Sequence, residues 1–325
     1  LFLVLQRVLA GELAISVVVV FMTTLLQFQR TIAALAGQIT WFNAEAVFLP
    51  IFDAFFRIVP EADTGKTLPR TSLTIAFEDV WFRYPDTDQD IIRGLSFQFH
   101  QGDHIALVGL NGAGKSTLLK LLMRMYEPTR GRILVNGIDL RAIKPSAWRS
   151  ALSILTQNIQ WYDDTMENQI LYGDIDRPKN HARLRMATHT SNIDEVIQEL
   201  PKGLQSHLGK QYAMEEDRPT ELSGGQNQML AIARTLYRDA RIYIFDEPTS
   251  AVDAEKEEHF FSSLPEALQS RALIFVSHRF STLRRARRIL VMDGGRIIED
   301  GTHEELLAKE GRYAELFTLQ AKLYQ

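Results

Sequence analysis

The stretch GLNGAGKST at residues 109–117 decides the fold of this chain. It follows the apolar run IALV and precedes LLKLLMRMY, whose apolar spacing is helical. This strand–loop–helix context is the one that a phosphate-binding P-loop requires, with Lys115 reaching the β- and γ-phosphates and the Ser116 hydroxyl on Mg²⁺. Glycines let the loop turn its N–H groups toward phosphate oxygens, and the helix start adds its own. The residues expected to bind nucleotide here are Gly109, Asn111, Gly112, Gly114, Lys115, Ser116 and Thr117.

Composition excludes several classes of function. The chain has 325 residues, enough for roughly two domains, with 46% hydrophobic residues and a net charge of −4. The chain lacks the excess of positive charge that is typical of nucleic-acid-binding proteins. No nucleic-acid partner is therefore predicted. Cysteine is absent, which excludes disulfides, cysteine zinc sites and thiol chemistry.

The first 59 residues differ from the rest. Residues 13–29 carry no charge, and as a helix they would extend about 26 Å, close to a hydrocarbon core of about 30 Å. The low-charge helical pattern continues through Phe48, Phe52, Phe55 and Phe56, and residues 1–10 read as the end of a preceding apolar helix. A membrane span is the favoured interpretation, and a buried helix of a soluble protein is the alternative. A signal peptide is a poor match, because the segment has no basic n-region.

Beyond this segment the pattern changes to an α/β one. Residues 60–70, with two prolines, read as a linker. Residues 73–82 and 91–99 are expected to form a small antiparallel sheet beside the P-loop strand. Short apolar runs at 151–155, 242–245, 272–276 and 289–292 indicate strands buried on both faces of a mainly parallel sheet. Residues 158–221 predict an inserted helical subdomain, and a helical tail is expected from 304 after the hairpin-like DGGRIIEDG.

Two carboxylates follow one of the buried runs. RIYIFDEP places Asp246 and Glu247 at a strand end, where alternating side-chain directions allow neighbouring groups separate roles. Asp246 is expected to hold Mg²⁺, as a P-loop enzyme requires. Glu247 would then face the attacking water as general base.

A second candidate anion site begins another helix. In LSGGQ, at residues 222–226, Ser223 is a good N-cap, and Gly224 and Gly225 leave backbone N–H groups open. The chain thus has two anion-binding helix starts but one evident nucleotide pocket. The second is therefore expected to serve a nucleotide held by another copy.

These motifs, in this order and spacing, resemble the nucleotide-binding domain of an ATP-binding cassette (ABC) protein over residues 73–325. The segment before them resembles the end of an exporter-type half-transporter. The resemblance implies ATP and Mg²⁺ as cofactors and an α/β P-loop NTPase fold: a RecA-like core with an antiparallel β subdomain and an inserted α-helical subdomain, preceded by an α-helical transmembrane segment. The expected domains are 1–59 (end of the transmembrane domain), 60–72 (linker) and 73–325 (ATP-binding domain).

The resemblance implies further roles. Tyr84 matches the aromatic residue that stacks on adenine, although sheet-edge tyrosines are also commonly just packed. Gln157 matches the glutamine that contacts Mg²⁺ and the attacking water. His278 matches the histidine at the γ-phosphate, and Asp253 matches an aspartate of the dimer interface. Gln226 completes the LSGGQ signature.

Three features depart from the family pattern or stand apart from it. Exporters usually carry a glycine-containing stretch before the signature, where this chain reads MEEDRPTE with Pro219. Pro50 falls inside the expected cytosolic extension of the membrane helix, so a kink is expected there. The basic run LRRARR at 283–288 is expected to be a solvated helix face.

We therefore expect an ATP hydrolase that drives export as a dimer with a second copy or a related half-transporter. It would lie in the cell membrane in contact with lipid, multi-pass in the full-length protein, with its ATPase domain in the cytoplasm. One span and the end of another cannot enclose a polar route, so further membrane helices are expected upstream. The transported substrate is not readable from these residues.

Two alternatives stay open at this point. The first is a soluble or membrane-anchored ABC ATPase without a transport role, of the ribosome- or chromosome-associated type. The second is an importer component. A P-loop GTPase is disfavoured, since no NKxD motif is present.

Overall fold

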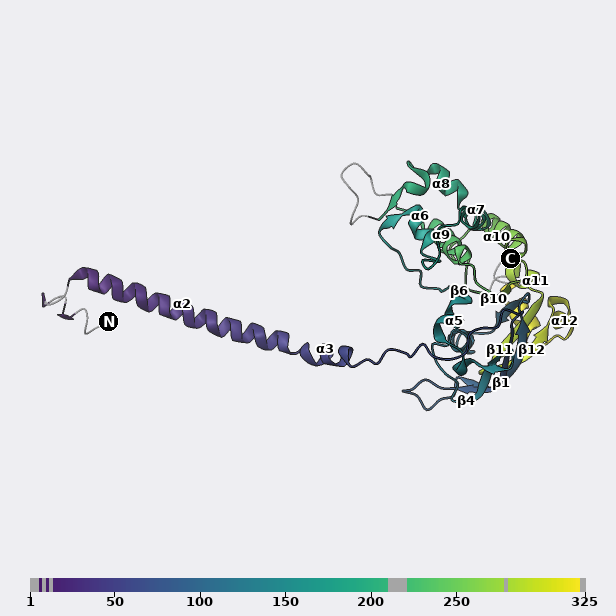
Figure 1. The fold of residues 1–325 in the computed structure, drawn as a ribbon, viewed down its shortest axis with the longest axis horizontal. Coiled ribbons are helices and arrows are strands. Elements are labelled where there is room, and N and C mark those ends of the chain that lie inside the picture. Colours follow the sequence, from purple (N-terminus) through teal and green to yellow (C-terminus); the bar gives the residue numbers. More distant parts are fainter. Residues whose placement is uncertain (1–5, 8–9, 12–13, 210–220, 278–279, 322–325) are drawn as a thin grey trace. The chain divides into compact units, whose positions relative to one another are not determined.

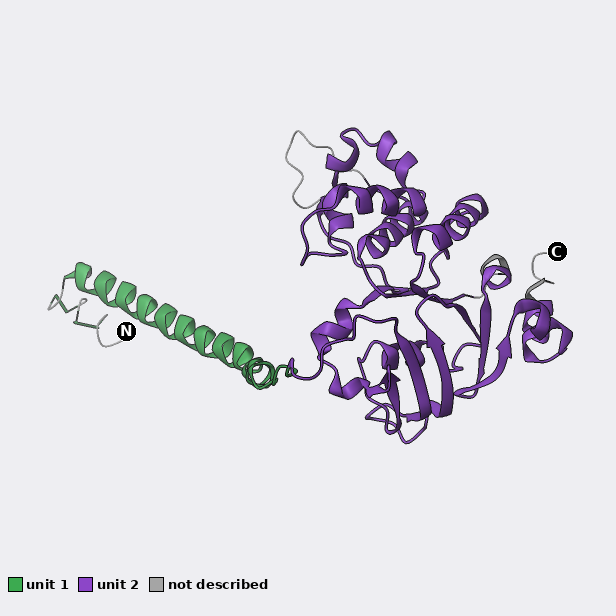
Figure 2. Ribbon diagram, turned by 45° about the vertical axis from the view of Figure 1, so that its right-hand side comes forward, with its two compact units in different colours: residues 1–62 green, residues 63–325 purple. Residues whose placement is uncertain are grey.

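The computed structural model describes residues 6–7, 10–11, 14–209, 221–277 and 280–321. The chain divides into two compact units, Leu1–Ala62 and Asp63–Gln325 (Figure 2). Of residues 1–10, expected to end a preceding helix, only 6, 7 and 10 are described, and the MEEDRPTE stretch lies outside the described residues up to residue 220.

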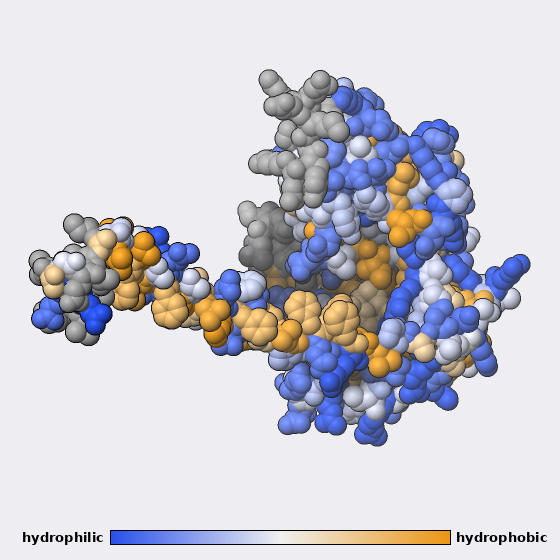
Figure 3. Space-filling model, turned by 60° about the vertical axis from the view of Figure 1, so that its left-hand side comes forward, coloured by the Kyte–Doolittle hydropathy of each residue, from blue (hydrophilic) through white to orange (hydrophobic). Residues whose placement is uncertain are grey.

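Unit 1 is built on two consecutive helices, α2 (Ile15–Ala46) and α3 (Leu49–Phe56) (Figure 1). The stretch Ser16–Phe56 is long and apolar enough to cross a membrane. Its apolar side chains are exposed all along it, as Figure 3 shows. The hydroxyls of Thr23, Thr24, Thr31 and Thr40 each donate to a carbonyl of the preceding turn. The polar side chains of these threonines are therefore satisfied within the helix, as a lipid environment demands.

The expected kink at Pro50 is found. Helix α2 ends at Ala46, and Pro50 is the second residue of α3. Proline is well tolerated in the first turn, because its missing N–H would have no helical partner there. The chain accommodates Pro50 by starting a new helix just before it.

Unit 2 is organised around a six-stranded sheet in the order β12-β11-β3-β10-β9-β6. All pairs are parallel except the final hairpin of β11 and β12. Along β9, Ile242 and Ile244 face one core while Tyr243 and Phe245 face another. The flat apolar runs in the sequence are confirmed as strands buried on both faces. Their bounds are β3 His104–Val108, β6 Leu152–Leu155, β9 Ile242–Asp246, β10 Ala272–Val276, β11 Arg288–Asp293 and β12 Arg296–Gly301.

A four-stranded antiparallel sheet has the order β2-β1-β4-β5. Strands β1 (Thr74–Phe82) and β2 (Ile92–His100) confirm the expected pair. Strands β4 (Arg130–Val135) and β5 (Ile138–Asp139) were not predicted. The dipeptide Asn136-Gly137 between them is a sequence signal for a hairpin turn. Both residues have the positive φ angles that such a turn requires, 51° and 77°.

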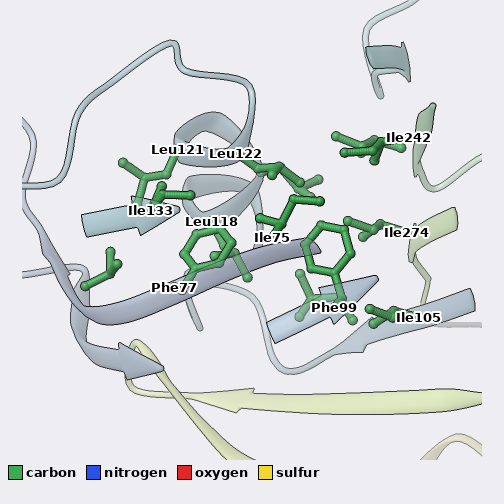
Figure 4. Close-up of a cluster of buried hydrophobic side chains, with 14 of the residues drawn as sticks. Ile75, Phe77, Phe99, Ile105, Leu118, Leu121, Leu122, Ile133, Ile242 and Ile274 are labelled. Carbon is green, nitrogen blue, oxygen red and sulfur yellow. The ribbon is translucent and has the colours of Figure 1, made fainter. Parts of the chain in front are cut away.

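The main core lies between the two sheets and helix α4 (Lys115–Leu122) (Figure 4). It combines Ile75, Phe77 and Phe99 of the antiparallel sheet with Ile105, Ile242 and Ile274 of the parallel sheet and with Leu118, Leu121 and Leu122 of α4. On α5 (Pro145–Ser150), the fully buried Trp148 donates its indole N–H to the Leu122 carbonyl, 2.8 Å away. Helix α4, and with it the preceding loop, is thus held by the core.

The inserted helical subdomain is present as expected. Helices α6 and α7 pack on α9, and α10 packs on α7. A second core joins these helices to the other face of the parallel sheet. The elements are β7 Asp164–Thr165, α6 Met166–Leu171, α7 His181–Thr190, α8 Asp194–Glu199, β8 His207–Leu208, α9 Gly224–Tyr237 and α10 Ala254–Ala267, with short 3-10 turns at Leu140–Ala142 and Gly203–Gln205.

The C-terminal region follows the basic run. Helix α11 (Phe280–Arg285) leads into β11, and after β12 the chain ends in α12 (His303–Ala308) and α13 (Arg312–Ala321). Leu306 and Tyr313 of this tail are fully buried against β11. In the basic run, Arg285 pairs with Glu258, and Arg288 pairs with Asp300 at 2.6 Å. The run is mostly exposed, and these arginines form ion pairs.

Residues 63–72, part of the expected linker 60–72, belong to unit 2 and contact its other elements at several points. The Asp63 carboxylate accepts hydrogen bonds from the N–H (2.9 Å) and hydroxyl (2.7 Å) of Ser146. Lys66 donates its N–H to the Ala142 carbonyl at 2.8 Å. Arg241, which precedes β9, donates to the Pro69 carbonyl at 2.6 Å. This segment is therefore attached along α5 and the start of β9.

Candidate nucleotide-binding site

One cavity in unit 2 brings together most of the predicted site residues. Its volume is about 850 Å³, and it lies beside the loop between β3 and α4. Tyr84, Gln157 and the adjacent pair Asp246 and Glu247 reach it from three different segments. The full lining is Tyr84, Ile91, Leu110, Asn111, Gly112, Gly114, Lys115, Ser116, Thr117, Gln157, Asp246, Glu247 and Val276.

The loop has the geometry expected of a P-loop. Strand β3 ends at Val108 and helix α4 begins at Lys115, with Gly114 at φ 102° as its N-cap. A Cβ on Gly114 would lie 2.9 Å from Ile92 Cδ1. Glycine is therefore needed here both for its backbone angle and for space. The N–H groups at the start of α4 have no helical partners and are available to an anion.

Lys115 lies at the centre of the loop. It is 7% exposed, and its ammonium donates to the carbonyls of Gly109 (2.6 Å) and Leu110 (3.0 Å). Burial lowers the pKa of Lys115, and the nearby carboxylates of Glu247 and Asp246 act in the opposite direction. The loop thus holds a positive charge beside two carboxylates in the same cavity.

Asp246 and Glu247 differ in environment and backbone. Asp246 is the last residue of β9, and burial raises its pKa, with a further rise from Glu247 and an opposing effect from Lys115. Glu247 has a positive φ of 53°, and its N–H donates to the Val276 carbonyl at 2.9 Å. A left-handed non-glycine residue is uncommon and concentrates at functional sites.

The residues predicted for Mg²⁺ fit that ion. Ser116, Gln157 and Asp246 line the one cavity and offer a hydroxyl, an amide and a carboxylate oxygen. Mg²⁺ prefers oxygen ligands and usually binds through one or two carboxylates together with substrate phosphates. Within the described residues no group of three or more His, Cys, Asp or Glu side chains could hold a metal by itself. This donor set suits a magnesium ion shared with a nucleotide.

Tyr84 lines the cavity and is also packed. Its ring contacts Phe82 and Tyr126 edge to face, with centroids 5.0 and 5.3 Å apart. Its hydroxyl lies 3.1 Å from the Thr117 hydroxyl and accepts from Lys120 at 3.3 Å. The tyrosine is therefore packed and its ring is held against α4, while its stacking on adenine stays a prediction.

The signature residues lie outside this cavity. Ser223 caps α9, accepting from the Gln226 N–H at 3.2 Å, while the Gln226 side chain accepts from the Ser223 N–H at 2.8 Å. Gly224 is exposed, and no atom lies within 4 Å of a Cβ built there. The predicted N-cap is confirmed, and the start of α9 is not part of the lining of the P-loop cavity.

The two remaining predicted residues have different outcomes. Asp253 caps α10, accepting from the Lys256 N–H at 3.0 Å, and this hydrogen bond lowers its pKa. It is exposed and does not line the cavity. His278 lies outside the described residues, directly after Ser277 at the end of the β10 region.

Comparison with known proteins agrees with this geometry. Residues 92–250 match the family described as ABC transporter. The chain is 42% identical over 263 residues to an ATP-dependent lipid A-core flippase of Methylobacillus flagellatus, covering 81% of this chain and 44% of that protein. This chain belongs to the ABC transporter family.

A second curated relative and a solved structure also match this chain. A lipid A-core flippase of Aromatoleum aromaticum is 37% identical over 98% of this ABC chain, and 52% of that protein is covered. A solved bacterial Atm1-family ABC exporter with ATP bound is 36% identical, with a TM-score of 0.73, over 81% of this chain and 45% of that one. The chain thus spans about half the length of the relatives it matches.

Sequence reasoning did not single out three residues that line the cavity of this ABC domain. They are Ile91, from the loop before β2, Leu110 and Val276. Leu110 could have been found as part of the P-loop itself. Ile91 and Val276 carry no local signal. Val276 reaches the loop because β10 pairs with β3 in the parallel sheet, and Ile91 because the antiparallel sheet packs beside it.

Proposed function

We propose that this chain is the ATP-hydrolysing part of an ABC exporter. The observation that carries the proposal is the convergence of Lys115, Gln157, Asp246 and Glu247 on one cavity of about 850 Å³ beside a P-loop. Family membership implies ATP binding, and the exposed apolar helix of unit 1 supports a membrane location. A soluble ribosome- or chromosome-associated ATPase is not favoured, because the described residues of unit 1 leave the apolar side chains of this helix exposed.

The chemistry follows from the placement of the side chains. Phosphoryl transfer depends mainly on positioning and on stabilising charge around an in-line attack. The P-loop N–H groups and Lys115 would bind the β- and γ-phosphates, and Gln157 would orient the attacking water. Glu247 would take the proton of that water. Held by Ser116, Gln157 and Asp246, Mg²⁺ would supply positive charge at the phosphate oxygens.

The charge of the Asp246 carboxylate depends on what is bound in this site. Its burial disfavours its charge, while Lys115 favours it. A bound cation would add to the effect of Lys115, so the ionised form of Asp246 would be further stabilised in the loaded site. The electrostatics are therefore suited to binding a metal–nucleotide pair rather than either alone.

We further propose that two copies, or this chain and a related half-transporter, share each nucleotide. Ser223 and Gly224 offer a capped but open helix start that the P-loop cavity does not use. Such a start binds anions through its N–H groups. Two ATP molecules would then lie between the P-loop of one copy and the LSGGQ of the other, and Asp253 would lie near that interface.

For the whole protein we propose a cell-membrane location with the ATPase unit in the cytoplasm, and the domains 1–59, 60–72 and 73–325. Relatives include lipid A-core flippases and the ABC multidrug transporter atrD of Emericella nidulans, 40% identical over 86% of this chain. These names differ in substrate, so the proposal concerns the ATP-driven step and leaves the cargo open.

The proposal is tested by ATP hydrolysis of the purified chain in detergent. The unmodified chain and the control Lys309→Ala, an exposed lysine of the tail, should release phosphate from Mg-ATP at equal rates. Lys115→Ala should bind ATP weakly and release almost none, because the charge that faces the phosphates is gone. Absence of hydrolysis by the unmodified chain, or full activity in Lys115→Ala, would contradict the proposal.

A further inference from the structure

The turn that follows β9 carries the proposed general base in an unusual backbone conformation. Glu247 has a φ of 53°, and residues 248–252 lead from it toward the start of α10. A glutamate holds such an angle only where its surroundings enforce it. The direction of the Glu247 carboxylate therefore depends on what holds this turn.

Gln228 is the side chain that spans the turn. It lies on α9, two residues after the signature, and is 5% exposed. Its amide N–H donates to the Glu247 carbonyl at 2.9 Å, and its amide oxygen accepts from the Ala251 N–H at 2.7 Å. The Ser250 hydroxyl lies 3.1 Å from the same amide nitrogen. One buried side chain thus bonds both ends of the turn.

These partners also fix the orientation of the amide. The Glu247 carbonyl can only accept, and the Ala251 N–H can only donate. A flipped amide would place oxygen against oxygen and N–H against N–H. The assignment of the two amide atoms therefore follows from the network itself.

The start of α9 contacts the same turn through main chain. A Cβ on Gly225 would lie 2.8 Å from the Ala251 carbonyl oxygen, so the signature glycine lies directly against the turn. On the opposite side, the Glu247 N–H is bonded to Val276 of β10. The turn is thus held between the signature helix and the sheet.

We propose that Gln228 is a positioning residue for ATP hydrolysis, holding the turn so that the Glu247 carboxylate meets the attacking water. This rests on the function proposed above, and adds to it a connection within one copy. The helix start that would contact the partner's ATP is joined through Gln228 to the base that acts on this copy's own ATP. Gln228 touches no substrate; it acts through Glu247.

The experiment compares Gln228→Met, which has similar volume but cannot bond the turn, with Thr235→Val. Thr235 is the matched control: it is buried on the same helix, at 6% exposed, and its hydroxyl bonds to Ala231 of that helix. Steady-state hydrolysis of Mg-ATP by the full chain gives kcat and KM, and thermal melting gives stability.

Gln228→Met should lower kcat by about 10- to 100-fold and leave the KM for ATP within about 3-fold, because small displacements of a reacting group are costly while the P-loop is untouched. Thr235→Val should keep kcat within about 2-fold. Gln228→Glu, which retains an acceptor for Ala251 but no donor for Glu247, should be as slow as Gln228→Met. In a Glu247→Gln background, Gln228→Met should add no further loss, since both act through one group.

Two results would overturn the inference. The first is a kcat of Gln228→Met equal to that of the unmodified chain. The second is a lower kcat, a higher KM and a lower melting temperature in both Gln228→Met and Thr235→Val. If Gln228→Met does not fold, the kcat and KM of Gln228→Glu decide by the same criteria. An unmodified chain that hydrolyses no ATP would instead contradict the proposed function, so the two failures are distinct.

Discussion

The backbone of Gly109 lies so close to the carbonyl of Met292 that a Cβ on Gly109 would be 2.3 Å from that oxygen. Gly109 opens the P-loop, and Met292 belongs to β11, the neighbour of β3 in the sheet. No side chain can be accommodated at that distance without moving one of the two strands. The P-loop is thus anchored at its first residue by a strand that comes almost two hundred residues later in the sequence.

Gly109→Ala should destabilise unit 2 by about 1–3 kcal/mol, as overpacking typically does, and weaken ATP binding. Gly102→Ala is the control, because Gly102 also has a positive φ, 105°, but nothing lies within 4 Å of a Cβ there. Thermal melting and nucleotide binding measure both effects. Equal ATP affinity in the two variants would contradict the role of the Gly109 contact.

Glu247→Gln should retain ATP binding and reduce turnover by about 10²- to 10⁴-fold, because an amide cannot take the proton of water. The unhydrolysed nucleotide should then hold two chains together, which size-exclusion chromatography with Mg-ATP detects. Glu258→Gln, an exposed glutamate paired with Arg285, is the control and should hydrolyse normally. Near-normal turnover in Glu247→Gln would exclude it as the base.

Lys115→Ala and Ser223→Arg should each inactivate a homodimer. Co-expressed, they form mixed dimers in which one nucleotide site carries both changes and the other carries neither. Random pairing predicts recovery of about a quarter of the normal activity if the sites work independently. Loss of ATP binding in an isolated Ser223→Arg monomer would place the signature in its own pocket and contradict the shared site.

Asp246→Asn should raise the melting temperature of the nucleotide-free protein at neutral pH. Burial raises the pKa of Asp246 above 3.8, so its ionised form disfavours folding, and stability falls as pH rises through the folded-state value. The gain from Asn should therefore vanish as pH falls below about 4.

Asp139→Asn is the control of opposite sign for this pH series. Its hydrogen bonds from Arg141 lower the pKa of Asp139, so the ionised form stabilises the fold. This variant should melt lower at neutral pH, with the difference lost as pH falls through its folded-state pKa. A melting temperature of Asp246→Asn that is lower at neutral pH would contradict the electrostatic account of the site.

Several features of the fold could be predicted because their signals are local. The P-loop, the four flat apolar strands and the Ser223 cap each depend on residues within one short segment. The hairpin of β4 and β5 was missed although Asn136 and Gly137 signalled it, since the polar start of β4 hides the strand pattern. The contacts of residues 63–72 with the rest of unit 2 were missed because a polar, proline-containing stretch has the same composition whether it is attached or free.

By itself, the sequence determined which chemistry this chain carries: a P-loop lysine, two carboxylates after a buried strand, and a capped glycine pair before a helix. Each is specified by neighbours along the chain, through backbone angles and side-chain alternation. Only the tertiary structure decided that Tyr84 is bonded to Thr117, that Gly109 meets Met292, and that Gln228 holds the turn of Glu247. Those partners lie 19 to 183 residues apart, and no local pattern encodes them, because they arise from how the two sheets and α9 pack around two cores.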